Sequence, residues 1–374
     1  MFSFLHSADW QIGTQFGQFE PEEAAHLAEA RFETVRRIAA LATERQVDAV
    51  LVAGDVFDQQ TVTDTVIRRL FGALAGFTGS WVLLPGNHDA ALAESVWKRA
   101  QRLNCVPANV HVVLEPGVRV FDDLKLALLC APLTQRNTYE DTTAFFDQAE
   151  SPDGYVRVGL AHGSVTGQLQ ELVDSTNPIA ADRAATARLD YLALGDWHGM
   201  KSVDERTWYA GTHEQDRFKN NGSGFVLHVT LSEPGAVPAV TPERVGKYTW
   251  HRWEPEVSLP TDVDQLKANL AELSDADVLR VIVTGAMSLS EAESINLAVE
   301  ETRARVRALR ADTTGLQVLP TDDELAALGA QGGYVAKVVA QLRELQADVS
   351  QGRVAAEALL MLAKFQRDVV GATA

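Results

Sequence analysis

The feature that most constrains the fold of this chain is a repeated pairing of a short apolar run with a cluster of Asp, Asn, His and Gly residues. Three such runs, each directly followed by a polar cluster, are residues 2–7, 47–53 and 81–84. Runs of this length are typical of buried strands, and the segments between them carry apolar residues at helical spacing. Because α/β folds place ligand-binding groups in the loops beyond strand ends, the pattern predicts an α/β fold with a site built from several loops.

The alternation extends over about the first 230 residues, with further strands expected over residues 124–130, 156–161 and 191–194. Residues 231–246 are rich in Pro and Gly, which indicates a domain border. Beyond this border we expect a small α+β domain over residues 250–320. Its expected elements are a helix opened by Thr261 with Asp264, a strand over 278–284, a helix capped by Ser290 with Glu293, and a strand over 316–319.

The final segment, residues 325–374, has the pattern of two helices that each carry one apolar stripe. The first stripe comprises Val335, Val338, Val339, Leu342 and Leu345, and the second comprises Val354, Ala358, Met361 and Phe365. A hairpin of two helices cannot bury both stripes by itself. Two interpretations therefore stay open: the hairpin packs on its own domain, or it docks onto the helices of a partner protein.

The charge of the chain limits how it can hold an acidic partner. Its 374 residues include 33 Lys and Arg against 51 Asp and Glu, a formal net charge of −18. This balance argues against binding nucleic acid mainly through a broad basic surface, although a metal site or a partner subunit can supply local positive charge. We also expect no disulfide framework, because only Cys105 and Cys130 are present, and neither a signal peptide nor a membrane span. A reducing cytoplasm fits these expectations.

Five polar clusters carry the expected chemistry, and each follows an apolar run. They are residues 9–11, 54–58, 86–89, 162–163 and 195–198. Their carboxylate, amide and imidazole groups suit Mn, Fe or Zn, and the set includes no thiolate. Two divalent ions held about 3.5–4 Å apart can activate a water and hold phosphate oxygens. Asp55 is the candidate for a carboxylate shared by both ions, so the five clusters together predict a two-metal phosphoesterase.

The order of these clusters resembles that of the calcineurin-like metallophosphoesterases, and most closely the SbcD-type DNA repair exonucleases, which are bacterial relatives of the Mre nucleases. The residues that carry the resemblance are 6–13, 54–58, 85–89, 161–163, 194–198 and 209–212. The resemblance implies an α/β core over residues 1–240, in which two β-sheets form a sandwich flanked by helices. It also implies a small α+β capping domain over 250–320 that takes part in DNA recognition, and a C-terminal helical hairpin over 325–374.

Position by position, the resemblance implies two sets of ligands that share Asp55. They are Asp9, Gln11, Asp55 and His198 for one ion, and Asp55, Asn87, His162 and Asp196 for the other. It further implies that His88 contacts the scissile phosphate and protonates the leaving oxygen, which suits an imidazole that titrates near neutral pH. Asp89 would orient the ring of His88.

The chain departs from the family pattern at two ligand positions, where Gln11 and Asp196 stand in place of histidines. Both changes replace an imidazole by an oxygen donor. We therefore expect two divalent ions of the harder kind, most of all Mn²⁺, with Mg²⁺ or Fe as alternatives, rather than Zn²⁺. The competing interpretation is that one ion site is lost and the protein is a scaffold.

Four residues near the clusters have less specific patterns. His213 and Arg217 follow the 209–212 motif, and we expect both to contact substrate. His6 precedes Asp9 by three residues and is expected to support the loop of Asp9 rather than bind metal. Trp10 could stack a base, although packing within its loop is the more usual role of such a residue.

These features predict a metal-dependent DNA nuclease, an exonuclease or an endonuclease, that hydrolyses phosphodiesters. By resemblance, the terminal helices would bind an SbcC-like, SMC-type ATPase, and the nuclease domain would form a homodimer. Two alternatives stay open: a phosphodiesterase for small or cyclic nucleotides, and a nuclease-fold scaffold with weakened metal sites.

Overall fold

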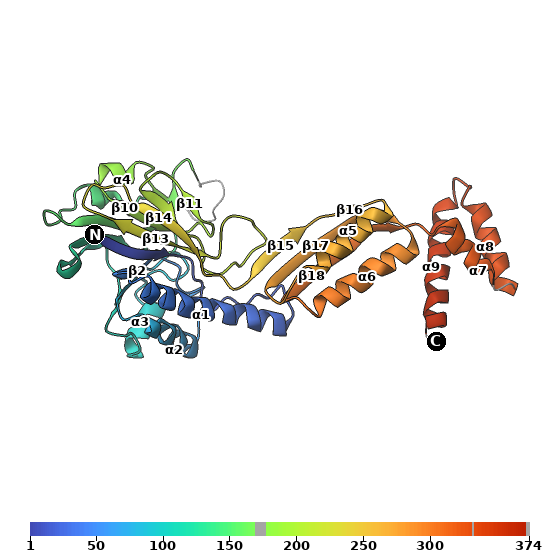
Figure 1. Cartoon of the computed structure of the whole chain (residues 1–374), viewed down its shortest axis with the longest axis horizontal. Coiled ribbons are helices and arrows are strands. Elements are labelled where there is room, and N and C mark those ends of the chain that lie inside the picture. The colour runs from blue at the N-terminus through green and yellow to red at the C-terminus, as the bar shows by residue number, and fades with distance from the viewer. Residues whose placement is uncertain (169–176, 331–332, 372–374) are drawn as a thin grey trace. The chain divides into compact units, whose positions relative to one another are not determined.

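The computed structural model describes residues 1–168, 177–330 and 333–371. They divide into two compact units, Met1–Thr249 and Trp250–Ala374. Figure 1 shows the course of the chain, with two sheets and their helices in the first unit and a smaller sheet with helices in the second.

One six-stranded sheet of the first unit has the order β14-β13-β1-β2-β3-β4. Its strands are β1 (Phe2–Ser7), β2 (Ala49–Val52), β3 (Ser80–Leu83), β4 (Val110–Val112), β13 (Phe225–Leu231) and β14 (Ala239–Arg244). The first four run parallel, so their carboxyl ends meet at one edge, while β13 pairs antiparallel with β1. Residues 239–244, expected within a domain border, instead form β14 and extend this sheet, because β13 offers them a free edge for backbone hydrogen bonds.

Helices cover the outer face of this sheet. They are α1 (Pro21–Glu44), α2 (Asp64–Ala73), the 3₁₀ turn η1 (Leu74–Gly76) and α3 (Val96–Arg102). α1 begins with Pro21 at its first position, where a missing backbone N–H has no consequence, and the Thr63 side chain accepts a hydrogen bond from Val66 N at the start of α2. The apolar face of α1, including Val35 and Ile38, packs on the sheet in one fully buried cluster.

The second sheet has the order β11-β12-β10-β7-β6-β5. Its strands are β5 (Gly117–Phe121), β6 (Leu126–Ala131), β7 (Val156–His162), β10 (Tyr191–Gly195), β11 (Lys201–Ser202) and β12 (Thr207–Tyr209). Phe4, Leu51 and Val82 from the first sheet share a core with Leu128 and Val158 from the second. The two sheets therefore form a sandwich, and the expected α/β core with two helix-flanked sheets is confirmed.

Small elements complete the first unit. They are the 3₁₀ turns η2 (Asp122–Leu124) and η3 (Ala144–Asp147), the paired strands β8 (Ser164–Val165) and β9 (Pro178–Ile179), and the one-turn helix α4 (Arg183–Thr186). η3 and α4 pack on the outer face of the second sheet through Phe146 and Ala184. Cys105 and Cys130 are both free thiols.

The second unit contains a four-stranded sheet with two helices. Its elements are β15 (Thr249–Trp253), β16 (Glu256–Val257), α5 (Pro260–Ala271), β17 (Asp277–Met287), α6 (Leu289–Arg303) and β18 (Ala308–Val318). Both helices of this sheet begin two residues earlier than the sequence predicts. Ser288 with Glu291, not Ser290 with Glu293, forms the capping box of α6, and α5 begins at Pro260 with Asp262 bonded back to Leu259 N.

Three helices end the chain: α7 (Asp322–Gly329), α8 (Gly333–Leu345) and α9 (Gly352–Gly371). Val339 of α8 is buried with Leu359 and Ala363 of α9 and with Leu289 of α6, so this hairpin packs in part on its own unit. The buried face of α9 comprises Ala355, Leu359 and Ala363, so the second apolar stripe named above is not the one that packs on this unit. Val354, Met361 and Phe365 are 60–67% exposed. None of the helices in the described ranges is long and apolar enough to cross a membrane.

Candidate metal centre

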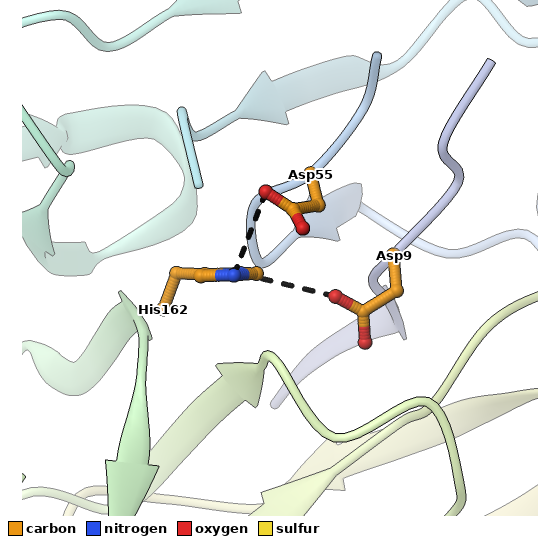
Figure 2. Close-up of side chains that lie close together, drawn as sticks. All are labelled: Asp9, Asp55 and His162. Carbon is orange, nitrogen blue, oxygen red and sulfur yellow. Dashed lines mark ion pairs between the residues drawn. The ribbon is translucent and has the colours of Figure 1, made fainter. Parts of the chain in front are cut away.

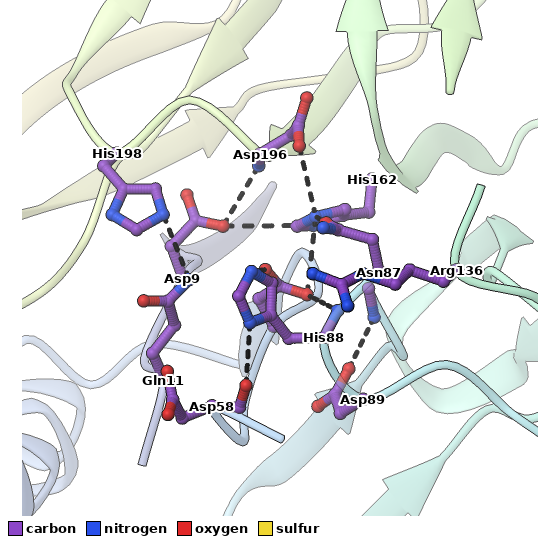
Figure 3. Close-up of polar contacts among 12 residues, drawn as sticks. Asp9, Gln11, Asp58, Asn87, His88, Asp89, Arg136, His162, Asp196 and His198 are labelled. Atoms are coloured by element: carbon purple, nitrogen blue, oxygen red, sulfur yellow. Dashed lines mark hydrogen bonds and ion pairs between the residues drawn. The ribbon is translucent and has the colours of Figure 1, made fainter. Parts of the chain in front are cut away.

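The polar clusters converge where parallel strands of the two sheets end (Figure 3). Asp9, Asp55 and the segment 86–89 follow β1, β2 and β3 of the first sheet, whereas His162 ends β7 and Asp196 follows β10 of the second. Parallel strands bring their carboxyl ends to the same edge. The sandwich therefore gathers into one site residues that lie up to about 190 positions apart in the sequence.

The backbone of the ligand loops is held in an unusual conformation. Asp9 and Asp55 both have φ of 52°, and Asp196 has φ of 105°. Positive φ in a residue other than Gly costs on the order of 1–3 kcal/mol and persists where the surroundings enforce it. Gly54 (φ 89°) and Gly86 leave room that a larger residue would fill, because a Cβ at Gly54 would overlap the His162 ring and one at Gly86 would overlap the Asp55 carboxylate. The loops are thus shaped around the polar side chains.

Asp9, Asp55 and His162 form a buried group whose possible ligand atoms all lie within 4.8 Å of one another (Figure 2). His162 Nε2 lies 3.6 Å from Asp55 Oδ1 and 3.8 Å from Asp196 Oδ1. His162 Nδ1 donates a hydrogen bond to Ala53 O at 2.8 Å. That bond fixes the ring so that Nε2, which also contacts Asn87 Oδ1 at 2.7 Å, is the nitrogen presented to the carboxylates.

The electrostatics of this group favour a cation. Burial alone would lower the pKa of His162, but the Asp55, Asp196 and Asp9 carboxylates raise it to about 9. Burial raises the pKa of Asp196 to about 7 and also raises that of Asp9, in both cases against the opposing effect of the nearby imidazoles. Buried carboxylates this close repel one another, so a positive charge among them is strongly stabilising.

Two buried carboxylate oxygens that lack hydrogen-bond partners in the described parts of the chain also indicate that the site suits divalent ions. Asp9 Oδ2 and Asp196 Oδ2 are buried and have no hydrogen-bond partner among the described residues. A buried carboxylate oxygen without a partner is costly, whereas a metal ion would satisfy it. The fit is therefore to oxygen-preferring divalent ions.

Gln11 and His198 extend the site on the side of Asp9. Gln11 is only 5% exposed, and its Nε2 lies 3.1 Å from His198 Nε2. A 180° rotation of the Gln11 amide would turn its oxygen to the same point. His198 Nδ1 donates to Asp216 Oδ2 at 2.9 Å, which leaves Nε2 as the nitrogen able to bind metal.

His88 stands at the edge of the buried group, with 31% of its side chain exposed. Its Nδ1 donates a hydrogen bond to Asp58 O at 2.7 Å, and its Nε2 lies 3.9 Å from Asp55 Oδ2. The expectation that Asp89 orients this ring is wrong. The Asp89 carboxylate is fully buried and accepts hydrogen bonds from Gly86 N at 2.7 Å and Phe57 N at 3.0 Å, so it holds the two loops together instead.

Among the other residues named from the sequence, some are too buried to contact a substrate. His213 has no exposed surface, and its Nε2 bonds to Arg31 O at 2.9 Å, so it is not positioned to contact substrate. Arg217 is 49% exposed and its Nη2 lies 3.3 Å from His198 Nε2, at the rim of the site. His6 contacts Tyr191 Oη and Leu194 O beneath the loop of Asp9. Trp10 is fully buried and packs on Trp81 and His213, so it cannot stack a base.

Sequence reasoning missed two charged residues that support the site. Asp216 was not singled out because it follows no strand. Arg31 is 1% exposed and donates to Trp10 O, Asp9 O and Thr212 Oγ1, which ties the first ligand loop to α1. A signal for Arg31 did exist, because this charged residue lies on the apolar face of α1, four residues from both Leu27 and Val35.

Known proteins support the same interpretation of the first unit. A family model described as calcineurin-like phosphoesterase matches residues 2–200. The chain is 33% identical over 233 residues to a Rhodobacter capsulatus protein named as a subunit of the nuclease SbcCD, a match that covers 56% of this chain and 52% of that protein. It is 26% identical over 244 residues to the uncharacterized metallophosphoesterase YhaO of Bacillus subtilis, covering 61% and 57%.

The chain thus spans little more than half the length of these curated relatives. Among solved structures, TT1561 of Thermus thermophilus superimposes with a TM-score of 0.43 at 12% identity, covering 65% of this chain and 99% of that one. The family model covers more than half of the 374 residues and includes the loops that carry Asp9, Asp55, Asn87, His162 and Asp196. This chain therefore belongs to the calcineurin-like phosphoesterase family.

Proposed function

We propose that this protein is a metal-dependent phosphodiesterase that cleaves DNA, as an exonuclease or an endonuclease. The observation that carries the proposal is the buried group of Asp9, Asp55, His162 and Asp196, with unsatisfied carboxylate oxygens and with His88 at its open edge. A relative named as a nuclease subunit, 33% identical over 233 residues, supports DNA as the substrate class.

The two ligand sets that we propose are those that the family resemblance implies, and contacts among their side chains support them. Asp9, Gln11 and His198 would hold one ion, Asn87, His162 and Asp196 the other, and Asp55 both. When bound, two divalent ions supply an activated water and positive charge beside the phosphate. Manganese is the metal we propose, with Mg²⁺ or Fe as alternatives, because the set contains more oxygen than nitrogen donors.

His88 has the geometry of a general acid for the departing oxygen. Its Nδ1 is committed to Asp58 O, so a proton on Nε2 points toward the site and can be passed to the leaving group. The backbone N–H of His88 donates to Asp55 Oδ1 at 2.9 Å, which fixes the position of the ring relative to the central carboxylate. Arg217 at the rim would contact a phosphate of the substrate.

For the rest of the chain we propose the organisation that the resemblance implies. Residues 1–240 would be the nuclease domain, 250–320 a capping domain for DNA recognition, and 325–374 the docking site for an SbcC-like, SMC-type ATPase. The exposed Val354, Met361 and Phe365 lie on one face of α9, at i, i+7 and i+11, and would be the contact surface. The nuclease domain would form a homodimer, and the cytoplasm is the proposed location.

The central test is cleavage of end-labelled DNA with Mn²⁺ by the wild type and by two variants. Asp55→Ala should abolish both metal binding and cleavage. His88→Ala should lower kcat by roughly 10²–10⁴ while two Mn²⁺ still bind per chain, since general acid catalysis contributes that factor. Equal cleavage by all three proteins would point to a contaminating nuclease and end the proposal.

The same preparation separates the two alternatives. No measurable metal at millimolar Mn²⁺ would support the scaffold, and turnover of cyclic or dinucleotides without cleavage of DNA would support the small-nucleotide enzyme. For the partner, Met361→Glu should abolish binding to the coiled-coil base of an SMC-type ATPase encoded in the same genome. Lys337→Glu, a charge change on the neighbouring α8, is the control. Unchanged binding of the Met361 variant would exclude this face.

A further inference from the structure

A cavity of about 430 Å³ opens beside the metal centre. Its walls come from the loops that follow β2, β3 and β6. Asn87 and His88 form the wall nearest the metal ligands, and Arg136 forms the wall contributed by the second sheet. The cavity is therefore continuous with the reacting centre on the side of His88.

Arg136 is the cationic residue among those that line this cavity. Figure 3 shows its side chain extending from the loop after β6 toward Asn87 and His88. The residue is exposed, and no described residue forms a hydrogen bond or ion pair with its guanidinium. In a chain of net charge −18, an arginine that has no carboxylate partner among residues 1–168, 177–330 and 333–371 is suited to an anionic ligand. The planar fork of its N–H groups matches phosphate oxygens in particular.

Asp58 also lines the cavity, next to His88, and the other walls are neutral and partly apolar. Gln60 is committed to the fold, because its Nε2 donates to Ala90 O at 2.9 Å and its Oε1 accepts from Val96 N at 2.8 Å. Gln59 and Thr61 are exposed and offer neutral hydrogen-bonding groups, and Leu92 is 37% exposed and offers an aliphatic surface. Neutral polar groups, a small apolar surface and one guanidinium suit a nucleoside that carries a phosphate.

We propose that this cavity binds the nucleoside on the leaving-group side of the scissile phosphate, and that Arg136 binds the next phosphate along the strand. The inference rests on the proposed phosphodiesterase function and names part of the substrate of that same site. His88 Nε2 faces the metal centre at the mouth of the cavity, so a leaving oxygen within its reach directs the attached nucleoside inward. A substrate with only one phosphate does not reach Arg136.

Equilibrium binding tests this without turnover. The probes are thymidine 3′,5′-bisphosphate and the thymidine 3′- and 5′-monophosphates, titrated into the Mn²⁺-loaded full chain by calorimetry. Wild type should bind the bisphosphate roughly 10- to 100-fold more tightly than either monophosphate, the range expected for a hydrogen bond to a charged group. Arg136→Ala should remove that difference and leave monophosphate binding within about twofold, and Arg136→Lys should retain part of it.

Arg119→Ala is the matched control. Arg119 is an exposed arginine on β5 of the same sheet, outside the ligand loops, so its loss changes the net charge equally and should leave the difference intact. As a second measurement, a trinucleotide should lose its advantage in kcat/KM over a dinucleotide only in the Arg136 variants.

The outcomes are distinct. If Arg136→Ala lost affinity equally for the mono- and bisphosphates, Arg136 would contact the metal-bound phosphate and the proposed subsite would be overturned. An unchanged preference of Arg136→Ala for the bisphosphate would also overturn the subsite. If the folded wild type with Mn²⁺ bound none of the three nucleotides, the phosphodiesterase function itself would fail, and the subsite with it. That result is recognised in the wild type, before any variant is compared.

Discussion

Replacing Asp216 by Asn should weaken the binding of one metal ion far more than the binding of the other. The Asp216 carboxylate accepts a hydrogen bond from His198 Nδ1 at 2.9 Å, and both side chains are only about a tenth exposed. Burial alone would raise the pKa of Asp216, but His198, Arg31 and Arg217 hold it well below its ordinary value, so the group stays ionised. An Asn amide can turn its N–H₂ toward Nδ1, which would favour the tautomer with the proton on Nε2 and block coordination there.

The expected loss of metal affinity follows from the role of a carboxylate that orients a metal-binding histidine. Loss of the hydrogen bond that orients a metal-binding His typically weakens metal affinity by about 10- to 100-fold, or ~1.4–2.7 kcal/mol. One effect opposes it. Burial lowers the pKa of His198, but the charge and the hydrogen bond of Asp216, together with the charge of Asp9, raise it above its ordinary value, so the variant frees Nε2 of competing protons more readily in acid. At pH 8 this opposing effect is small, and the measurement belongs there.

Mn²⁺ titration followed by electron paramagnetic resonance or calorimetry should resolve one site weakened about 10- to 100-fold and one site within about threefold of wild type. Saturating Mn²⁺ should restore most of the cleavage rate. The control is Asp277→Asn, which breaks a similar bond, 2.7 Å from Asp277 to His251 Nε2, in the second unit. The reasoning is refuted if Asp216→Asn binds both ions as tightly as wild type, or if Asp277→Asn weakens binding equally.

Three further outcomes follow from the same geometry. Gly54→Ala should lower the melting temperature and Mn²⁺ affinity together, because its Cβ would overlap the His162 ring at a φ of 89°; Gly17→Ala, with open space around it, should change neither. In the metal-free protein His162, with a pKa of about 9, and Asp196, near 7, hold protons that metal must displace. Affinity should therefore rise with pH, and Mn²⁺ should raise the melting temperature more at pH 8 than at pH 6 by fluorimetry; an equal rise contradicts this. Finally, activity should be stronger with Mn²⁺ than with Zn²⁺, and the reverse order would refute the argument from Gln11 and Asp196.

The sandwich and the ligand loops were predictable because each depends on a local pattern. Runs such as 49–52 and 191–194 are apolar throughout, as is typical of strands buried on both faces, and a polar cluster follows the end of each strand. Once parallel strands are assumed, the residues after them must share an edge. That step brings Asp9 and Asp196 together without knowledge of any contact.

Asp216 and Arg136 could not be found in this way. Both lie several residues beyond the end of the preceding strand, and their positions depend on residues 18 or more positions away. The buried face of α9 could not be identified from the sequence for another reason. The helix carries two apolar stripes, and only packing against α8 and α6 decides that the stripe of Ala355, Leu359 and Ala363 is buried rather than that of Val354 and Phe365.

The charge of the proposed ligand set would make the two rim arginines important for substrate binding. Two divalent ions would carry four positive charges, and the Asp9, Asp55 and Asp196 carboxylates would supply three negative ones, which would leave a single positive charge for the phosphate. An imidazole at position 196 would leave two. The additional carboxylate would hold the ions more tightly but would stabilise the developing charge on the phosphate less. Arg136, beside His88, and Arg217, beside His198, could restore the lost positive charge. We therefore expect substrate binding here to depend on guanidinium groups more strongly than it would with an imidazole at position 196.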